Sequence, residues 1–328
     1  MTYKSGKEDI TRRQFINKLA IGGGAALGAA AVTYFAHSDK PVYRQPEKIF
    51  TLPDFGAEIS KVYPRIVITH GTRPLAMVRA AVDRMGGIEK FIQPGDRVVI
   101  KPNVAWDRLP EQAANTNPDV VAAVVTIVKE ARAGQIIVTD VSLNDPERCF
   151  ARSGIEEAAS IAGGKIWIPA ATDFKLADLK GELLNVWPVS RAFLEADKVI
   201  NLPVVKHHSL SQCTLAQKNW YGILGGRRNR LHQDIHTSIA DLSQAMLPTL
   251  TILDGTRALM RNGPTGGNPG DVETHNIIIA GLDEVAIDSY GMGILGIDPN
   301  DVKYMALAQK RGLGRIDWKS VSHYEINV

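Results

Sequence analysis

The stretch VINLPVVKHHSLSQCTLAQKNWYGILGG, residues 199–226, carries the signal that decides the fold. Its first seven residues are apolar apart from one asparagine, and a short apolar run of this kind is typical of a buried strand. Polar residues follow at once, beginning with Lys206, His207 and His208. Because open α/β sheets bind their ligands at the carboxyl ends of the strands, this order predicts a site just after residues 199–205.

Outward from this stretch, short apolar runs alternate with helical patterns. Asn117 followed by Pro118 is a typical helix start, and Pro248 ends a helical period of apolar residues. Repeated strand–helix–strand units predict an α/β fold, mainly a parallel sheet with helices on both faces and a ligand crevice at the carboxyl edge. The expected strands are residues 65–69, 96–100, 135–139, 165–168, 199–205 and 249–253, and the expected helices are 73–85, 117–132, 146–162 and 231–247.

Several of the predicted strands end in polar residues, and in a parallel sheet these ends lie along one edge. A local alternative exists for single members of the set, since Asp254 precedes a glycine in a typical turn pair and Asp140 could cap a helix. We expect the set as a whole to converge on one crevice. Its members are Lys101, Asn103, Asp140, Lys206, His207, His208 and Asp254.

The opening stretch also resembles a known family. Together with VVIKPNVAW at residues 98–106 and TILDGTRALMRNGPTGG at 251–267, it is similar to the domain of unknown function 362. The resemblance spans about residues 66–313 and implies an α/β domain with a polar ligand or metal site, without an established reaction.

Many members of that family carry ferredoxin-like cysteine clusters for iron–sulfur centres. This chain has only Cys149 and Cys213, so an iron–sulfur cluster is not expected here. The separation of these residues in sequence leaves open whether they form a disulfide, and we expect two free thiols.

The histidines suggest a metal. His207 and His208 are adjacent, so an extended chain would point them to opposite sides, and the resemblance selects His208. His232 and His236 are four residues apart on an expected helix, and the resemblance favours His232. We therefore predict a divalent metal held by His208, His232 and Asp254. The alternative for the second pair is an exposed polar helix face.

A glycine-rich and arginine-rich segment follows Lys218 and Asn219 and suggests an anionic ligand, because arginines supply planar donors for carboxylate or phosphate. An ordinary exposed basic loop is the alternative. We predict ligand binding by Lys101, Asn103, Asn219 and Arg227, and catalysis by Lys206, His208, Lys218 and Asp254.

Two classes of function fit these residues. In the first, the protein is an exported enzyme that positions an anionic substrate, while a histidine and an aspartate bind a metal or act as acid and base. In the second, the crevice only captures a metal, a cofactor or an organic anion for a redox partner. Residue types alone do not separate the two.

The amino terminus predicts export. Residues 11–16, TRRQFI, resemble the twin-arginine consensus and precede an uncharged run at residues 19–36. We predict a signal peptide at residues 1–36, the twin-arginine machinery as a partner and a periplasmic location. An uncleaved anchor in the inner membrane is the alternative. Residues 37–63 contain three prolines and suggest a linker or an arm, and residues 64–328 form the expected α/β domain.

The charge of the exported part argues against a nucleic-acid partner. Of the 38 Lys and Arg, five lie before His37, and of the 35 Asp and Glu two do, which leaves 33 of each. A chain without net positive charge lacks the main electrostatic attraction for the phosphates of a nucleic acid. The chain of 328 residues is long enough to bury a substantial core, and the sequence says nothing about its oligomeric state.

Overall fold

The computed structural model describes Arg13 and residues 48–328. Lys48–Val328 form one compact unit. Apart from Arg13, the predicted signal peptide lies outside the described residues, as does the first part of the predicted linker. Within the described part of the chain, no helix combines the length and the apolar character needed to cross a membrane.

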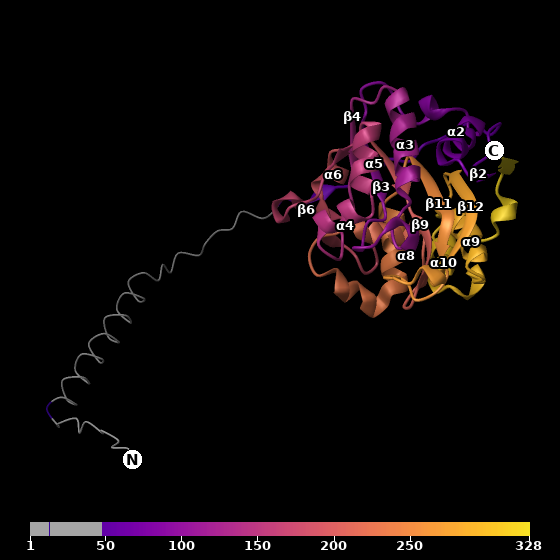
Figure 1. Ribbon diagram of the computed structural model, residues 1–328. Coiled ribbons are helices and arrows are strands. Elements are labelled where there is room, and N and C mark those ends of the chain that lie inside the picture. The colour runs from indigo at the N-terminus through magenta and orange to yellow at the C-terminus, as the bar shows by residue number, and fades with distance from the viewer. Residues whose placement is uncertain (1–12, 14–47) are drawn as a thin grey trace, which may run out of the picture. The chain divides into compact units, whose positions relative to one another are not determined.

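A largely parallel sheet lies at the centre of the unit, as the sequence predicts (Figure 1). Along the main path of this sheet, neighbouring strands are parallel except where β12 pairs with β11 and β2. The order is β13 (His323–Asn327), β2 (Ile66–His70), β12 (Val272–Gly281), β11 (Leu250–Leu259), β8 (Lys198–Leu202), β3 (Arg97–Pro102), β4 (Gln135–Val138) and β5 (Lys165–Ile166).

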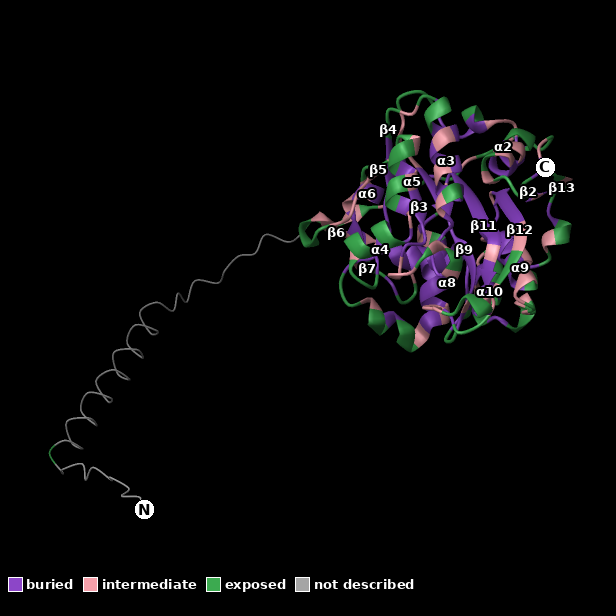
Figure 2. Ribbon diagram, in the orientation of Figure 1, coloured by how far each residue is buried: buried purple, intermediate pink, exposed green. Residues whose placement is uncertain are grey.

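Alternate residues of the strands belong to two separate apolar cores, because successive side chains of a strand point to opposite faces of the sheet. In β3, Val98 and Ile100 belong to one apolar cluster and Val99 to the other. Figure 2 shows the strands buried between helices whose outer faces are exposed. One face is covered by α2 (Pro74–Arg84), α3 (Pro118–Glu130), α4 (Pro146–Arg152) and α5 (Ile155–Ala162), the other by α7 (Ala216–Asn219), α8 (Ile235–Ala245), α9 (Glu284–Ile294) and α10 (Lys303–Lys310).

The strand that opens the quoted stretch is divided at Pro203. Before it, β8 pairs with β3 and β11, and after it β9 (Val204–His208) pairs with β11 alone on the parallel side. The chain then turns back as β10 (Gln212–Thr214), antiparallel to β9. Because residues two apart on a strand share a face, Lys206 and His208 lie on one side of β9 and His207 on the other.

Two helices and one strand are among the predicted elements whose bounds differ in the structure. The helix expected at residues 146–162 is interrupted at Gly154, whose φ of +73° is a left-handed conformation that ends α4 and begins α5. The helix expected at 231–247 starts at Ile235, after a 3₁₀ turn at Arg228–Asp234. The strand expected at 249–253 continues to Leu259, because β12 pairs along its whole length.

A second, smaller sheet lies beside α6 (Arg191–Leu194). It contains β1 (Phe50–Thr51), β6 (Phe174–Asp178) and β7 (Val186–Ser190), with β1 parallel and β7 antiparallel to β6. Phe55, which follows β1, is buried in the core. The described part of the segment predicted as a linker or arm, from Lys48 onward, therefore packs on the domain.

Candidate functional site

A cavity of about 140 Å³ opens where β3, β4 and β9 end at the carboxyl edge of the sheet. The loop after β11 also reaches it, through Pro264. Asp140 and six more of the residues predicted from the sequence line this cavity. The six are Asn103, Lys206, His208, Lys218, Asn219 and His232.

A chain of side-chain hydrogen bonds forms the floor of the cavity. The Lys206 ammonium group donates to Asn103 Oδ1 at 2.8 Å and to the carbonyl oxygen of Ala114 at 2.6 Å. Asn103 Nδ2 donates to Asn219 Oδ1 at 3.0 Å, and Asn219 Nδ2 donates to Asn201 Oδ1 at 2.8 Å. Each amide is thus held in one orientation, so the floor is fixed before any ligand enters.

Lys101 lies just beneath this floor and does not line the cavity. Its Nζ donates to Asp140 Oδ1 at 2.7 Å and to Asn219 Oδ1 at 3.1 Å, and its side chain is fully buried. Burial lowers the pKa of Lys101, while the charge of Asp140 opposes that change. The role of Lys101 is therefore to neutralise Asp140 and to orient Asn219, rather than to touch a ligand.

Lys218 is the least satisfied cation of the site. Its side chain is only 7% exposed, yet among the described residues its Nζ has no hydrogen-bond acceptor and no carboxylate partner. Its nearest aromatic contact is Tyr221, whose ring centroid lies 4.5 Å from Nζ. Burial lowers the pKa of Lys218 to about 8. A buried ammonium without a counter-charge is costly, and an anion in the cavity would supply the missing charge.

The geometry around His208 fixes which ring nitrogen carries the proton. Its Nδ1 accepts hydrogen bonds from the backbone N–H groups of Leu210 at 3.1 Å and Ser211 at 3.3 Å. Burial, followed by the charges of Lys218 and Lys206, lowers the pKa of His208 to about 2, so the ring is neutral. The proton of a neutral ring must then sit on Nε2, which becomes a hydrogen-bond donor. His208 is thus suited to an anion and lacks a lone pair to offer to a metal.

The structure does not bring the three predicted metal ligands together, because His208 and His232 line the cavity and Asp254 does not. Both oxygens of Asp254 are occupied, by Asn117 N at 2.8 Å and by Thr256 N and Oγ1 at 3.0 and 2.6 Å. Within the described part of the chain, no three His, Cys, Asp or Glu side chains are grouped closely enough to hold an ion.

The prediction for Asp254 fails because the strand does not end there. Since β11 runs on to Leu259, Asp254 lies inside the strand, where it pairs with Val204 and caps the amino end of α3 through Asn117. His232 and His236 lie in different surroundings, because His232 precedes α8 and contacts Tyr221, whereas His236 stacks on Tyr304.

The arginine prediction was off by one residue. Arg227 is exposed and does not line the cavity, whereas Arg228 does. Arg228 donates to the carbonyl oxygens of Val141, Ser142 and Tyr221 at 2.8–3.2 Å. It therefore joins the loop after β4 to the segment after α7 and adds a positive charge beside the cavity.

Two buried carboxylates of α9, Glu284 and Asp288, support the site. Glu284 accepts hydrogen bonds from Asn201 Nδ2 at 2.6 Å and from Trp220 Nε1 at 2.9 Å. Asp288 accepts the backbone N–H groups of Ala216 and Gln217. Nothing in the local sequence of α9 distinguishes these two residues from exposed acids of a helix, because their role depends on burial.

Cys149 and Cys213 are both buried and free, as expected. Cys213 Sγ lies 3.3 Å from the hydroxyl oxygen of Tyr304, and burial raises the pKa of this thiol to about 12. A thiol with such a pKa is a poor nucleophile near neutral pH.

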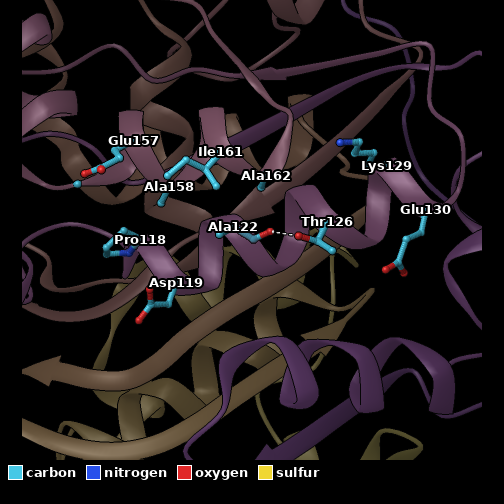
Figure 3. Close-up of a pocket in the computed structure, with 11 residues that line it drawn as sticks. Pro118, Asp119, Ala122, Thr126, Lys129, Glu130, Glu157, Ala158, Ile161 and Ala162 are labelled. Atoms are coloured by element: carbon cyan, nitrogen blue, oxygen red, sulfur yellow. Dashed lines mark hydrogen bonds between the residues drawn. The ribbon is translucent and has the colours of Figure 1, made fainter.

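A larger and more open hollow lies between α3 and α5 (Figure 3). Its ionisable side chains include Lys129, Glu130 and Glu157, which are exposed, and Thr126 donates to the carbonyl oxygen of Ala122 within α3. Unlike the cavity at the sheet edge, it has no buried charge that calls for a ligand.

The chain is similar to known proteins over most of its length. Residues 98–293, which contain most of the cavity, match the family described as "Domain of unknown function (DUF362)". A thylakoid-associated protein of Synechocystis is 31% identical over 254 residues, which cover 73% of this chain and 75% of that protein. The lactate racemase apoprotein of Thermoanaerobacterium thermosaccharolyticum is 13% identical with a TM-score of 0.36, and the match covers 72% of this chain and 58% of that one.

Proposed function

The chain belongs to the family of the domain of unknown function 362, and we propose that its cavity binds a small organic anion and exchanges a proton with it. Lys218 and the Nε2–H group of His208 hold the anion. Lys206 gives or takes the proton. The protein is thus an enzyme of acid–base chemistry in this proposal.

The surroundings of Lys218 carry the proposal. Lys101 and Asp140 compensate each other at 2.7 Å, and the charge of Arg228 is spread over three carbonyl oxygens. Lys206 has two neutral oxygen acceptors. Lys218 has neither a carboxylate nor an acceptor among the described residues, so a bound anion would stabilise the site most strongly there.

The two acceptors of Lys206 support its role in proton transfer. A neutral amine has two N–H groups, which match Asn103 Oδ1 and the Ala114 oxygen, and one remaining lone pair. When Lys206 is protonated, its ammonium group keeps the same two hydrogen bonds, and its third proton occupies the position of the lone pair. Burial and the charge of Lys218 lower the pKa of Lys206 to about 7, which suits a residue that exchanges protons near neutral pH.

Binding to Lys218→Met tests the anion site. We expect the wild-type protein to bind at least one of acetate, benzoate and malonate, as measured by titration calorimetry. Lys218→Met should weaken that ligand at least tenfold, because the uncompensated charge is gone. Lys90→Met, a change of an exposed lysine, is the matched control. Equal affinities in the wild type and Lys218→Met would contradict the proposal.

We also propose that the chain is exported through the twin-arginine route. The support is the TRRQFI sequence at residues 11–16. Replacing Arg12 and Arg13 by lysines should leave the protein in the cytoplasm, as judged by fractionation and immunoblotting, because the machinery reads the arginine pair. Undiminished recovery from the periplasm would refute this assignment.

A further inference from the structure

Burial divides the lining of the cavity into a charged floor and a more exposed rim, which has an apolar part and a polar part. Lys206, His208 and Lys218 are 1%, 6% and 7% exposed and lie at the floor. The apolar part of the rim contains Trp106 and Val141, which are half-buried, together with Leu143 and Pro264, and the polar part contains Arg228, Asn229 and His232. A ligand that fits the floor and the apolar part of the rim has its charge at one end and apolar atoms at the other.

The donors at the floor suit a carboxylate better than a phosphate. Lys218 Nζ and His208 Nε2 are donors at the floor without an acceptor among the described residues, and a carboxylate has two oxygens to receive them. Phosphate sites commonly add backbone N–H groups at the start of a helix. Here those of Ala216 and Gln217, at the start of α7, already donate to Asp288 at 2.6 and 3.1 Å.

The rim is held in place by hydrogen bonds of its own. The backbone N–H and carbonyl of Trp106 bind the side chain of Asn115 at 3.1 and 2.7 Å. The loop that carries Pro264 is tied down by Arg108, whose Nε donates to the Thr265 oxygen at 3.0 Å. The apolar surface of such a rim is already in place before binding. A ligand can therefore contact it without the entropy cost of ordering the loops.

We infer that the ligand is a small monocarboxylate with an aliphatic or aromatic tail, its carboxylate on Lys218 and His208 and its tail between Trp106, Val141 and Pro264. This inference rests on the proposed function and narrows it. The size agrees, since an apolar cavity of about 150 Å³ accepts benzene and this one measures about 140 Å³.

A ligand series tests the inference. Acetate, butyrate, hexanoate and benzoate would each be titrated into the full-length protein by calorimetry. Their affinities would be compared with those of phosphate and malonate. Each buried methylene group should raise the affinity about fourfold. Trp106→Ala should remove most of the gain from acetate to hexanoate and leave acetate binding within about twofold. Leu109→Ala, in the same loop and outside the cavity lining, is the control.

The outcomes separate this inference from the proposed function. If phosphate or malonate binds more tightly than monocarboxylates of similar size, the apolar-tail inference is wrong while the anion site stands. If Trp106→Ala weakens acetate as much as hexanoate, the tail does not lie on Trp106 and the inference also fails. If no anion binds the wild-type protein, both the inference and the proposed function are wrong. Val141→Thr would replace Trp106→Ala if that variant does not fold.

Discussion

At the scale of single residues, the site contains two lysines in unlike surroundings. Lys206 has two oxygen acceptors, whereas Lys218 faces an aromatic ring. Both are buried and both have lowered pKa values, of about 7 and about 8. The charged groups around Lys206 are Lys218 and Lys101, which lower its pKa, and Asp140, which raises it. An anion between the lysines would raise both pKa values, so binding and protonation are coupled.

This coupling predicts a definite pH dependence. Anion affinity should be highest below about pH 7, where both lysines are protonated, and should fall as the pH rises through about 8. The stability of the ligand-free protein should change with pH in the opposite direction and increase as the pH rises. Because the unfolded lysines titrate near 10.4, the unfolded chain binds more protons between about pH 7 and 10, and stability increases with pH over that range.

Thermal unfolding of the wild type and of Lys206→Met, from pH 6 to 9.5, measures the effect. The contribution of each lysine is at most about 1.36 kcal/mol per pH unit. The rise in unfolding midpoint with pH should be smaller in Lys206→Met than in Lys90→Met, the exposed control. A rise of the same size in both variants would show that Lys206 titrates as an ordinary lysine.

At the scale of elements, α7 shows how a short helix is held under the cavity. It has only four residues, too few to be stable alone, and it carries Lys218 and Asn219. Its amino end is tied to α9, because Asp288 accepts the N–H groups of Ala216 and Gln217 and the side-chain amide of Gln217. The position of two cavity residues therefore depends on a carboxylate in a distant part of the sequence.

Asp288→Ala should accordingly destabilise the fold. It leaves buried N–H donors without an acceptor, and each such loss costs about 1–3 kcal/mol. We expect the free energy of unfolding, from urea titration followed by circular dichroism, to fall by about 3 kcal/mol or more. Asp301→Ala, on the exposed surface, should change it little. A loss no larger than that of Asp301→Ala would contradict the role given to Asp288.

The elements also show why part of the site could be read from the sequence. Apolar runs followed by polar residues correctly placed polar side chains near the carboxyl ends of β3, β4 and β9, and several of them meet at one cavity, although β3 and β9 run on to Pro102 and His208. The same pattern misled at Asp254, because the sequence does not reveal that β12 extends the pairing of β11 to Leu259. A polar residue in a strand can cap a neighbouring helix as readily as it can bind a ligand.

Other features of the site depend on distances that no local pattern encodes. The choice of Arg228 over Arg227 is set by the 3₁₀ turn that begins there, and the tautomer of His208 is set by two backbone N–H groups. A chelating role for His208 was a reasonable expectation from residue type alone. The hydrogen bonds to its Nδ1 point instead to a donor for an anion.

At the scale of the whole molecule, the sheet separates two apolar cores and brings Lys206, His208 and Lys218 together at its carboxyl edge. The carboxyl edge of an open α/β sheet is where such folds bind ligands. The match to the domain of unknown function 362 covers the strands and loops that build this cavity. The central claim is therefore that one anion occupies the cavity, with its charge at the floor.

A crystal structure of the protein with 4-bromobenzoate tests that claim most directly, because anomalous scattering locates the bromine without ambiguity. We predict a carboxylate about 2.7–3.2 Å from both Lys218 Nζ and His208 Nε2, with the bromine beside Trp106 at the rim. A bound 4-bromobenzoate whose carboxylate lies away from Lys218, or a cavity that stays without the ligand at saturating concentration, would contradict the account.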